Sequence, residues 1–420
     1  MRLKLILTFA IPYERFYEPM KTRICIALLG LFVVSAATSW AVPPLVTNVR
    51  STQRAGSQLV DIYYNVSDPD SAAVTVYLAI SADAGTNYNI PVVTLSGAYG
   101  PGISLGVDRH IVWNAGLDWG GQFSSQCRAK IYADDGSGAS APPGMVFIPP
   151  GTFQMGDNFA VDSGALPVHP VFVSAFFMAK FEVTLQLWSD VYSWATNRGY
   201  QFTYIGNGAG PSYPVFGPNW FDVVKWCNAR SEMEGLSPVY FTSSQQTNVY
   251  RSGNIELVNA AVRWNANGYR LPTEAEWEKA ARGGLSGQHY PWPSAGSNYS
   301  NSINGSMANY NSSGDPFGVH SPVGYYNGGQ SPAGTNMANG FGLYDMAGNV
   351  QEWCWDRNAA YSANLETDPH GQDLTVNGRI IRNGSWAHST REMRSASRSS
   401  LSTGSQDING YRGFRCVRSL

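Results

Sequence analysis

The stretch between residues 285 and 340 most constrains the fold, because it is long and rich in Gly, Asn and Ser. A compact domain rarely contains such a stretch unless the loop has a function or is held in place by ions. Yet 13% of the chain is aromatic, including 13 Trp, which is far too rich for a disordered chain. We therefore expect a folded domain in which a large aromatic core supports long, irregular loops.

Length and charge limit the class of protein further. The 420 residues suggest two to three domains, since a typical domain has roughly 100–200 residues. A net charge of −2 lacks the basic footprint of a nucleic-acid-binding protein, so no nucleic-acid partner is expected. Six His and five Cys leave little room for a His-rich metal enzyme.

The N-terminal region predicts export. Residues 24–36 form an uninterrupted apolar run preceded by Lys21 and Arg23, as in a signal peptide. The run is shorter than the roughly 20 residues of a membrane span, so no stable span is expected after cleavage. We assign residues 1–41 to a signal peptide, with Met20 as a candidate true start and an uncleaved anchor as the alternative. The mature chain should be secreted or periplasmic, in an oxidising compartment.

Residues 43–137 predict an all-β module. Short β-branched and aromatic runs follow one another with turn residues between them, which is typical of a β-sandwich; they cover 59–66, 73–80, 109–114 and 128–133. The module resembles an immunoglobulin- or fibronectin-like domain of exported bacterial proteins. Such modules are usually spacers or adhesion units. Residues 138–143 form a Gly, Ser and Pro-rich linker, and residues 144–420 form one larger domain.

Three helices can be placed in the larger domain. The first runs from Thr184 to about Thr196 and the second from about Asn219 to Met233, each with one apolar face. The third begins at the capping box Thr273-Glu274-Ala275-Glu276 and ends at Gly283. We assign this domain, in which helices alternate with long Gly, Asn and Ser-rich stretches, to the α+β class.

Six segments of this domain resemble the sulfatase-modifying-factor family, which contains the formylglycine-generating enzymes (FGE). They are GMVFIPPGTFQMG (144–156), FEVTLQLW (181–188), GYRLPTEAEWEKAARGG (268–284), GFGLYDMAGNVQEWCWD (340–356), IIRNGSWAHSTREMRSASR (380–398) and GYRGFRCV (410–417). The resemblance implies a loop-rich variant of the C-type-lectin fold. It also implies an enzyme that uses copper and oxygen to oxidise a sulfatase cysteine to formylglycine.

The family reaction requires two cysteines in the loop after the signature that is here Asn383-Gly384-Ser385-Trp386, because two thiolates capture copper(I). The loop Ala387–Met393 contains no cysteine, and His388 stands where the first would be expected. Copper and the family reaction are therefore not expected. Whether the chain is an enzyme stays open.

Two cysteines match family positions that form a structural disulfide in some members. Cys227 lies in the second predicted helix and Cys416 in the GFRC segment. The alternative is a pair of buried free thiols.

The resemblance also implies two structural calcium sites, since calcium prefers several oxygen ligands held by a tight loop. The residues at the first site are Asp345, Gly348, Val350 and Glu352. Those at the second are Asn309, Tyr310, Asp315 and Phe317, for which an ordinary Asx turn is the alternative.

We expect the domain to bind an exported protein, peptide or glycan in a cleft. The candidate pocket residues are Trp353, Ser385, His388 and Arg394. One alternative is an oxidoreductase of the same family that matures an exported substrate through a site without cysteine. Another is a structural or surface-adhesion protein in which the β module does the work.

Overall fold

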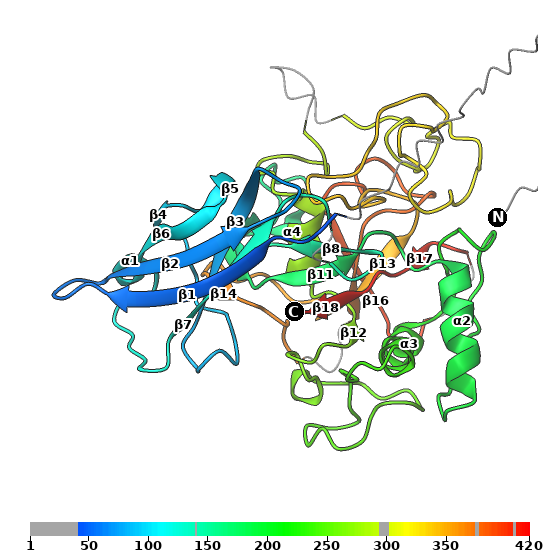
Figure 1. Ribbon diagram of the computed structural model, residues 1–420. Coiled ribbons are helices and arrows are strands. Elements are labelled where there is room, and N and C mark those ends of the chain that lie inside the picture. Colours follow the sequence, from blue (N-terminus) through cyan, green and yellow to red (C-terminus); the bar gives the residue numbers. More distant parts are fainter. Residues whose placement is uncertain (1–40, 139–140, 294–301, 374–377, 406–408) are drawn as a thin grey trace, which may run out of the picture. The chain divides into compact units, whose positions relative to one another are not determined.

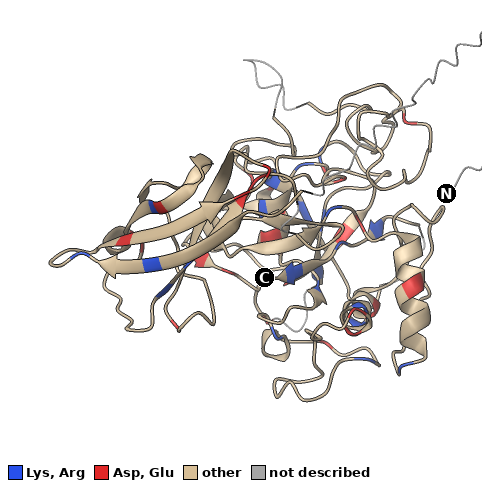
Figure 2. Cartoon of the chain, in the orientation of Figure 1, with Lys and Arg blue, Asp and Glu red and all other residues tan. Residues whose placement is uncertain are grey.

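The computed structural model describes residues 41–138, 141–293, 302–373, 378–405 and 409–420. The predicted signal peptide, residues 1–41, lies almost wholly outside these ranges. Within them, no helix is both long and apolar enough to cross a membrane. Charged residues are few, and both signs are interspersed along the described chain (Figure 2).

The N-terminal module consists of two antiparallel sheets, as predicted (Figure 1). One sheet has the order β1-β2-β6-β4, with β1 Leu45–Gln53, β2 Leu59–Ser67, β6 Gly106–Asn114 and β4 Leu95–Gly97. The other has the order β5-β3-β7, with β5 Gly100–Ser104, β3 Ala73–Ser81 and β7 Arg128–Asp134, and a short helix, α1, spans Ala115–Asp118. Alternate residues of β2 are buried, which is the period-2 pattern of strands that cover one core.

Among the residues that the structure describes, the C-terminal domain contains three small sheets joined by long loops. The first is β14-β10-β9, with β14 Glu366–Thr367, β10 His169–Val173 and β9 Gly151–Met155. The second is β12-β18-β11-β8, with β12 Tyr269–Arg270, β18 Val417–Ser419, β11 Phe176–Ala179 and β8 Met145–Ile148. The third is β16-β15-β13-β17, with β16 Arg398–Leu401, β15 Arg379–Arg382, β13 Gln351–Arg357 and β17 Arg412–Gly413.

The three predicted helices are confirmed: α2 Leu185–Thr196, α3 Trp220–Met233 and α4 Glu274–Arg282. Thr273 caps α4 through the predicted capping box. The Thr273 hydroxyl accepts from the Glu276 N–H, and the Glu276 carboxylate accepts from the Thr273 N–H. Gly283 ends α4 in the left-handed conformation. Two short 3₁₀ turns are also present in the described ranges, at Ser163–Ala165 and Asn259–Ala261.

The core of this domain is aromatic, as the Trp content predicted. The rings of Trp188 on α2 and Trp226 on α3 stack with centroids 5.6 Å apart, which holds the two helices together. Trp353 and Trp355 of β13 are fully buried in the same cluster. The core cluster is therefore built from helices, strands and the segments between them.

Candidate functional site

The loop after the Asn383-Gly384-Ser385-Trp386 signature is closed by hydrogen bonds of the signature's own side chains. The Ser385 hydroxyl lies 2.6 Å from Nδ1 of His388, and Ser385 is fully buried. The Trp386 indole N–H donates to the Gly410 carbonyl at 3.0 Å. His388 is half-buried, and burial lowers the pKa of its imidazole. The contact between His388 and the buried Ser385 therefore closes this loop.

The other two candidate pocket residues have different partners. Trp353 is fully buried in the aromatic core, so it cannot line an open cleft. Arg394 is buried and forms an ion pair with Asp157 at 2.8 Å. Of the four predicted pocket residues, Ser385 and His388 are thus in direct contact. Trp353 packs in the core, and Arg394 is paired with Asp157.

The oxygens predicted for the first calcium site are bonded to donors of the protein. Nδ2 of Asn383 donates to the carbonyl oxygens of Gly348 and Val350 at 2.7 and 3.1 Å, and the Asp345 carboxylate accepts from the Gly324 N–H at 2.6 Å. In return, Oδ1 of Asn383 accepts from the Gly348 N–H at 2.7 Å. An amide group therefore stands at the point on which these carbonyls converge.

The fourth predicted ligand, Glu352, is held by Arg415. The guanidinium Nε lies 2.9 and 2.8 Å from the two carboxylate oxygens, and the Trp277 indole N–H donates to one of them at 2.7 Å. Donors of this chain thus already bond to the predicted oxygens, so no calcium ion is needed to hold the loop.

Two buried carboxyl groups next to this loop carry perturbed pKa values. Burial raises the pKa of Asp345 to about 6. Burial, reinforced by the nearby Asp345 and Glu352, raises the pKa of Glu182 well above its usual value. Glu182 accepts from the Asn349 side chain and from the Val350 N–H, so a second buried carboxyl group holds the same loop. Sequence reasoning missed Glu182 and Asn383, although both lie inside family segments.

The second predicted calcium set forms the Asx turn that was its alternative. Oδ1 of Asp315 accepts from the Phe317 N–H at 2.9 Å, and the Ser313 hydroxyl bonds to the other oxygen. The Tyr310 carbonyl accepts from the Ser313 N–H, and Nδ2 of Asn309 donates to the Val319 carbonyl.

Chelation tests both calcium sets at once. Because protein donors hold these oxygens, we expect EDTA to leave the melting temperature of the purified chain unchanged. Differential scanning calorimetry with EDTA, and then with excess calcium, measures the effect. A fall in EDTA that calcium restores would show instead that the side chains give way to the ion.

The cysteines are placed as follows. Sγ of Cys227 on α3 lies 3.9 Å from Sγ of Cys416, so the structure brings the pair together but contains no bond between them. The predicted disulfide is therefore absent here, and both residues are buried thiols. Cys354 is also buried, which raises the pKa of its thiol well above the usual value. Among the described residues, no cysteine lies near His388 in the Ala387–Met393 loop.

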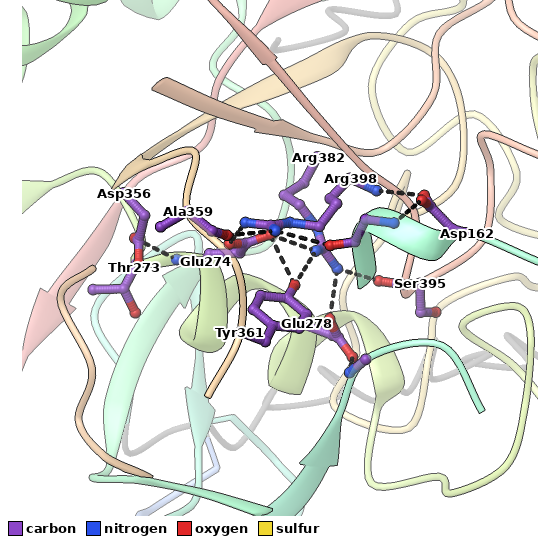
Figure 3. A network of polar contacts seen from close by, with 12 residues as sticks. Asp162, Thr273, Glu274, Glu278, Asp356, Ala359, Tyr361, Arg382, Ser395 and Arg398 are labelled. Atoms are coloured by element: carbon purple, nitrogen blue, oxygen red, sulfur yellow. Dashed lines mark hydrogen bonds and ion pairs between the residues drawn. The ribbon is translucent and has the colours of Figure 1, made fainter. Parts of the chain in front are cut away.

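A buried ionic network, which the sequence did not reveal, joins α4 to β15 and β16 (Figure 3). Arg382 donates to Glu274 at 2.9 Å and to Glu278 at 2.8 Å. Arg398 pairs with Glu274 at 2.7 Å, and the Tyr361 hydroxyl donates to the same carboxylate at 3.0 Å. Both arginines are thus paired with buried carboxylates.

A cavity of about 390 Å³ lies beside this network. Its walls include Asp356, whose carboxylate accepts from the Glu274 N–H at 2.7 Å (Figure 3). Burial, and then the charge of Glu274, raises the pKa of Asp356 to about 8. His169, Glu366 and His370 also line the cavity. The cavity therefore combines several titratable groups.

The raised pKa of Asp356 predicts a pH dependence of stability. The unfolded-state pKa is about 3.9, so the contribution of Asp356 to stability is fully present below pH 4 and is lost as the pH rises towards 8. Asp356→Asn has no such loss. We expect the free energy of unfolding of this variant, relative to the unsubstituted chain, to increase between pH 5 and pH 8 in urea titrations. The exposed control Asp190→Asn should show no such trend, and an equal difference at both pH values for Asp356→Asn would refute the assignment.

Comparison with known protein families agrees with the resemblance seen in the sequence. Residues 134–420 match the FGE-sulfatase family, described as a sulfatase-modifying factor enzyme 1-like domain, and the chain belongs to this family. The loop-rich, C-type-lectin-like fold implied by the resemblance is thereby confirmed.

Three relatives illustrate the range of the family. The formylglycine-generating enzyme of Streptomyces coelicolor is 33% identical over 305 residues, which cover 65% of this chain and 88% of that protein. The chaperone protein LppX of Paenibacillus barcinonensis is 31% identical over 270 residues, which cover 63% of this chain and 87% of that protein. The solved structure of Treponema denticola variable protein 1 has a TM-score of 0.51 and 28% identity, and the match covers 66% of this chain and 95% of that one.

Proposed function

We propose that this chain is an exported FGE-family protein that binds a protein or peptide ligand and does not oxidise cysteine. The observation that carries the proposal is the loop Ala387–Met393, which contains no cysteine and is closed by the contact between Ser385 and His388. A bis-thiolate copper(I) site needs two thiolates at this place, and one imidazole cannot supply them.

The cysteines in the described part of the chain do not supply such a site near the loop. Cys227 and Cys416 face each other in the core, and Cys354 is buried on β13. Cys127 belongs to the N-terminal module. A substrate cysteine held beside His388 would therefore meet no described thiol of this chain.

The ligand class is inferred from the chain's environment and relatives. The apolar run of residues 24–36 supports export. Similarity to the chaperone protein LppX favours a protein or peptide over a glycan as the ligand.

Oxygen consumption tests this proposal. The chain is mixed with copper and a cysteine-containing peptide, and the Streptomyces coelicolor enzyme serves as the positive control. We expect no oxygen consumption beyond that of copper and peptide alone. Sustained consumption that is lost in His388→Ala would overturn the proposal and support the oxidoreductase alternative.

A further inference from the structure

We infer that the cavity beside the ionic network is a binding site for a divalent transition-metal ion such as Zn²⁺, held by His169 and Glu366. Both residues line the cavity. His169 is 1% exposed, whereas the Glu366 side chain is 41% exposed, so the cavity has a buried imidazole at its base and a carboxylate towards solvent.

The imidazole of His169 is oriented as a metal ligand. Its Nδ1 lies 3.0 Å from the Pro167 carbonyl, which can only accept, so the tautomer with its proton on Nδ1 fits this contact. Nε2 then carries the lone pair, and it is buried without a hydrogen-bond partner among the described residues. A backbone carbonyl that fixes one ring nitrogen while the other remains available is the usual outer-shell arrangement of metal-binding histidines.

Glu366 lies at the right distance to share an ion with His169. Its Oε2 is 3.7 Å from Nε2, which is too long for a hydrogen bond. Two ligands that are each about 2.0–2.2 Å from one zinc ion lie roughly 3.3–3.7 Å apart. The distance therefore matches two coordination positions of one ion.

Paired strands hold the two proposed ligands in position before an ion binds. β10 pairs with β14 in parallel, with Val171 opposite Glu366, and β10 also pairs with β9, with His169 opposite Met155. The Tyr361 ring packs against His169 with centroids 4.9 Å apart. Sites on regular elements are more precise than sites on loops.

Charge in the cavity also favours a cation. Arg398 is paired with Glu274, and Arg357 is paired with Glu256. The Glu366 carboxylate has no such arginine partner among the described ion pairs. Two protein ligands leave further coordination positions open to water or to an incoming ligand.

Titration of the purified chain, made without a histidine tag, tests this inference. We expect isothermal titration calorimetry to show one equivalent of Zn²⁺ per chain, and Co²⁺ to give a visible absorption band at the same stoichiometry. Glu366→Gln keeps the size of a half-exposed side chain and should weaken Zn²⁺ binding at least tenfold without changing the melting temperature. His169→Gln should abolish binding.

Matched controls separate this site from other side chains. His289→Gln and Asp190→Asn should bind Zn²⁺ as the unsubstituted chain does. The absence of saturable binding would overturn the inference, and so would a Glu366→Gln variant that binds as tightly as the unsubstituted chain, whatever His169→Gln does. Either result leaves the oxygen-consumption test of the proposed function unaffected.

Discussion

Replacing Arg382 by methionine is expected to lower the free energy of unfolding by about 3–5 kcal/mol. Arg382 lies on β15 with its guanidinium fully buried, and it bonds to Glu274 and Glu278 of α4 (Figure 3). Methionine fills a similar volume but carries no charge. Two buried carboxylates then lose a cationic partner, and the remaining arginines, Arg398 and Arg282, must neutralise them alone.

Urea denaturation followed by circular dichroism measures this effect. The control is Arg391→Met, because Arg391 is exposed and its described bond goes to the Val161 carbonyl. Its effect should stay within about 0.5 kcal/mol. If Arg382→Met costs no more than the control, the network does not stabilise the fold as described.

Oxidation of the Cys227 and Cys416 pair is expected to raise the free energy of unfolding by about 5 kcal/mol. The two residues are 189 positions apart, and a cross-link between them restricts most of the unfolded C-terminal domain. Their sulfurs are 3.9 Å apart as thiols and must approach to about 2.05 Å to bond. An oxidising compartment, as proposed for this chain, would favour that bond.

Chemical denaturation with and without a reducing agent tests the cross-link, with a thiol count to establish the redox state. Cys227→Ala should remove any difference between the two conditions. Equal stability of the oxidised and reduced chains, with two thiols titrated in both, would show that the pair remains reduced.

Local patterns were predictable from the sequence. The α4 capping box spans four residues, and the burial of Trp188, Val191 and Ala195 follows from helical spacing. The long-range contacts were not predictable in this way. Arg382 and Glu278 are 104 residues apart, so no local pattern pairs them.

The same contrast between local patterns and long-range contacts applies to the candidate functional residues. The family segments pointed to the Asp345–Glu352 loop, but they did not show that Asn383 and Arg415 would satisfy its oxygens. Side chains that meet across loops depend on the register of distant strands. The pairing of β10 with β14, which places Glu366 near His169, is of this kind.

Mass spectrometry of a cysteine-containing sulfatase peptide tests the central claim most directly. The peptide is incubated with the copper-treated chain, with the copper-treated Streptomyces coelicolor enzyme in parallel. Because the loop after Trp386 contains no cysteine, the peptide should keep its cysteine in the presence of this chain and be converted by the enzyme. Formation of formylglycine that requires this chain would contradict the claim that the family's fold is present here without the family's reaction.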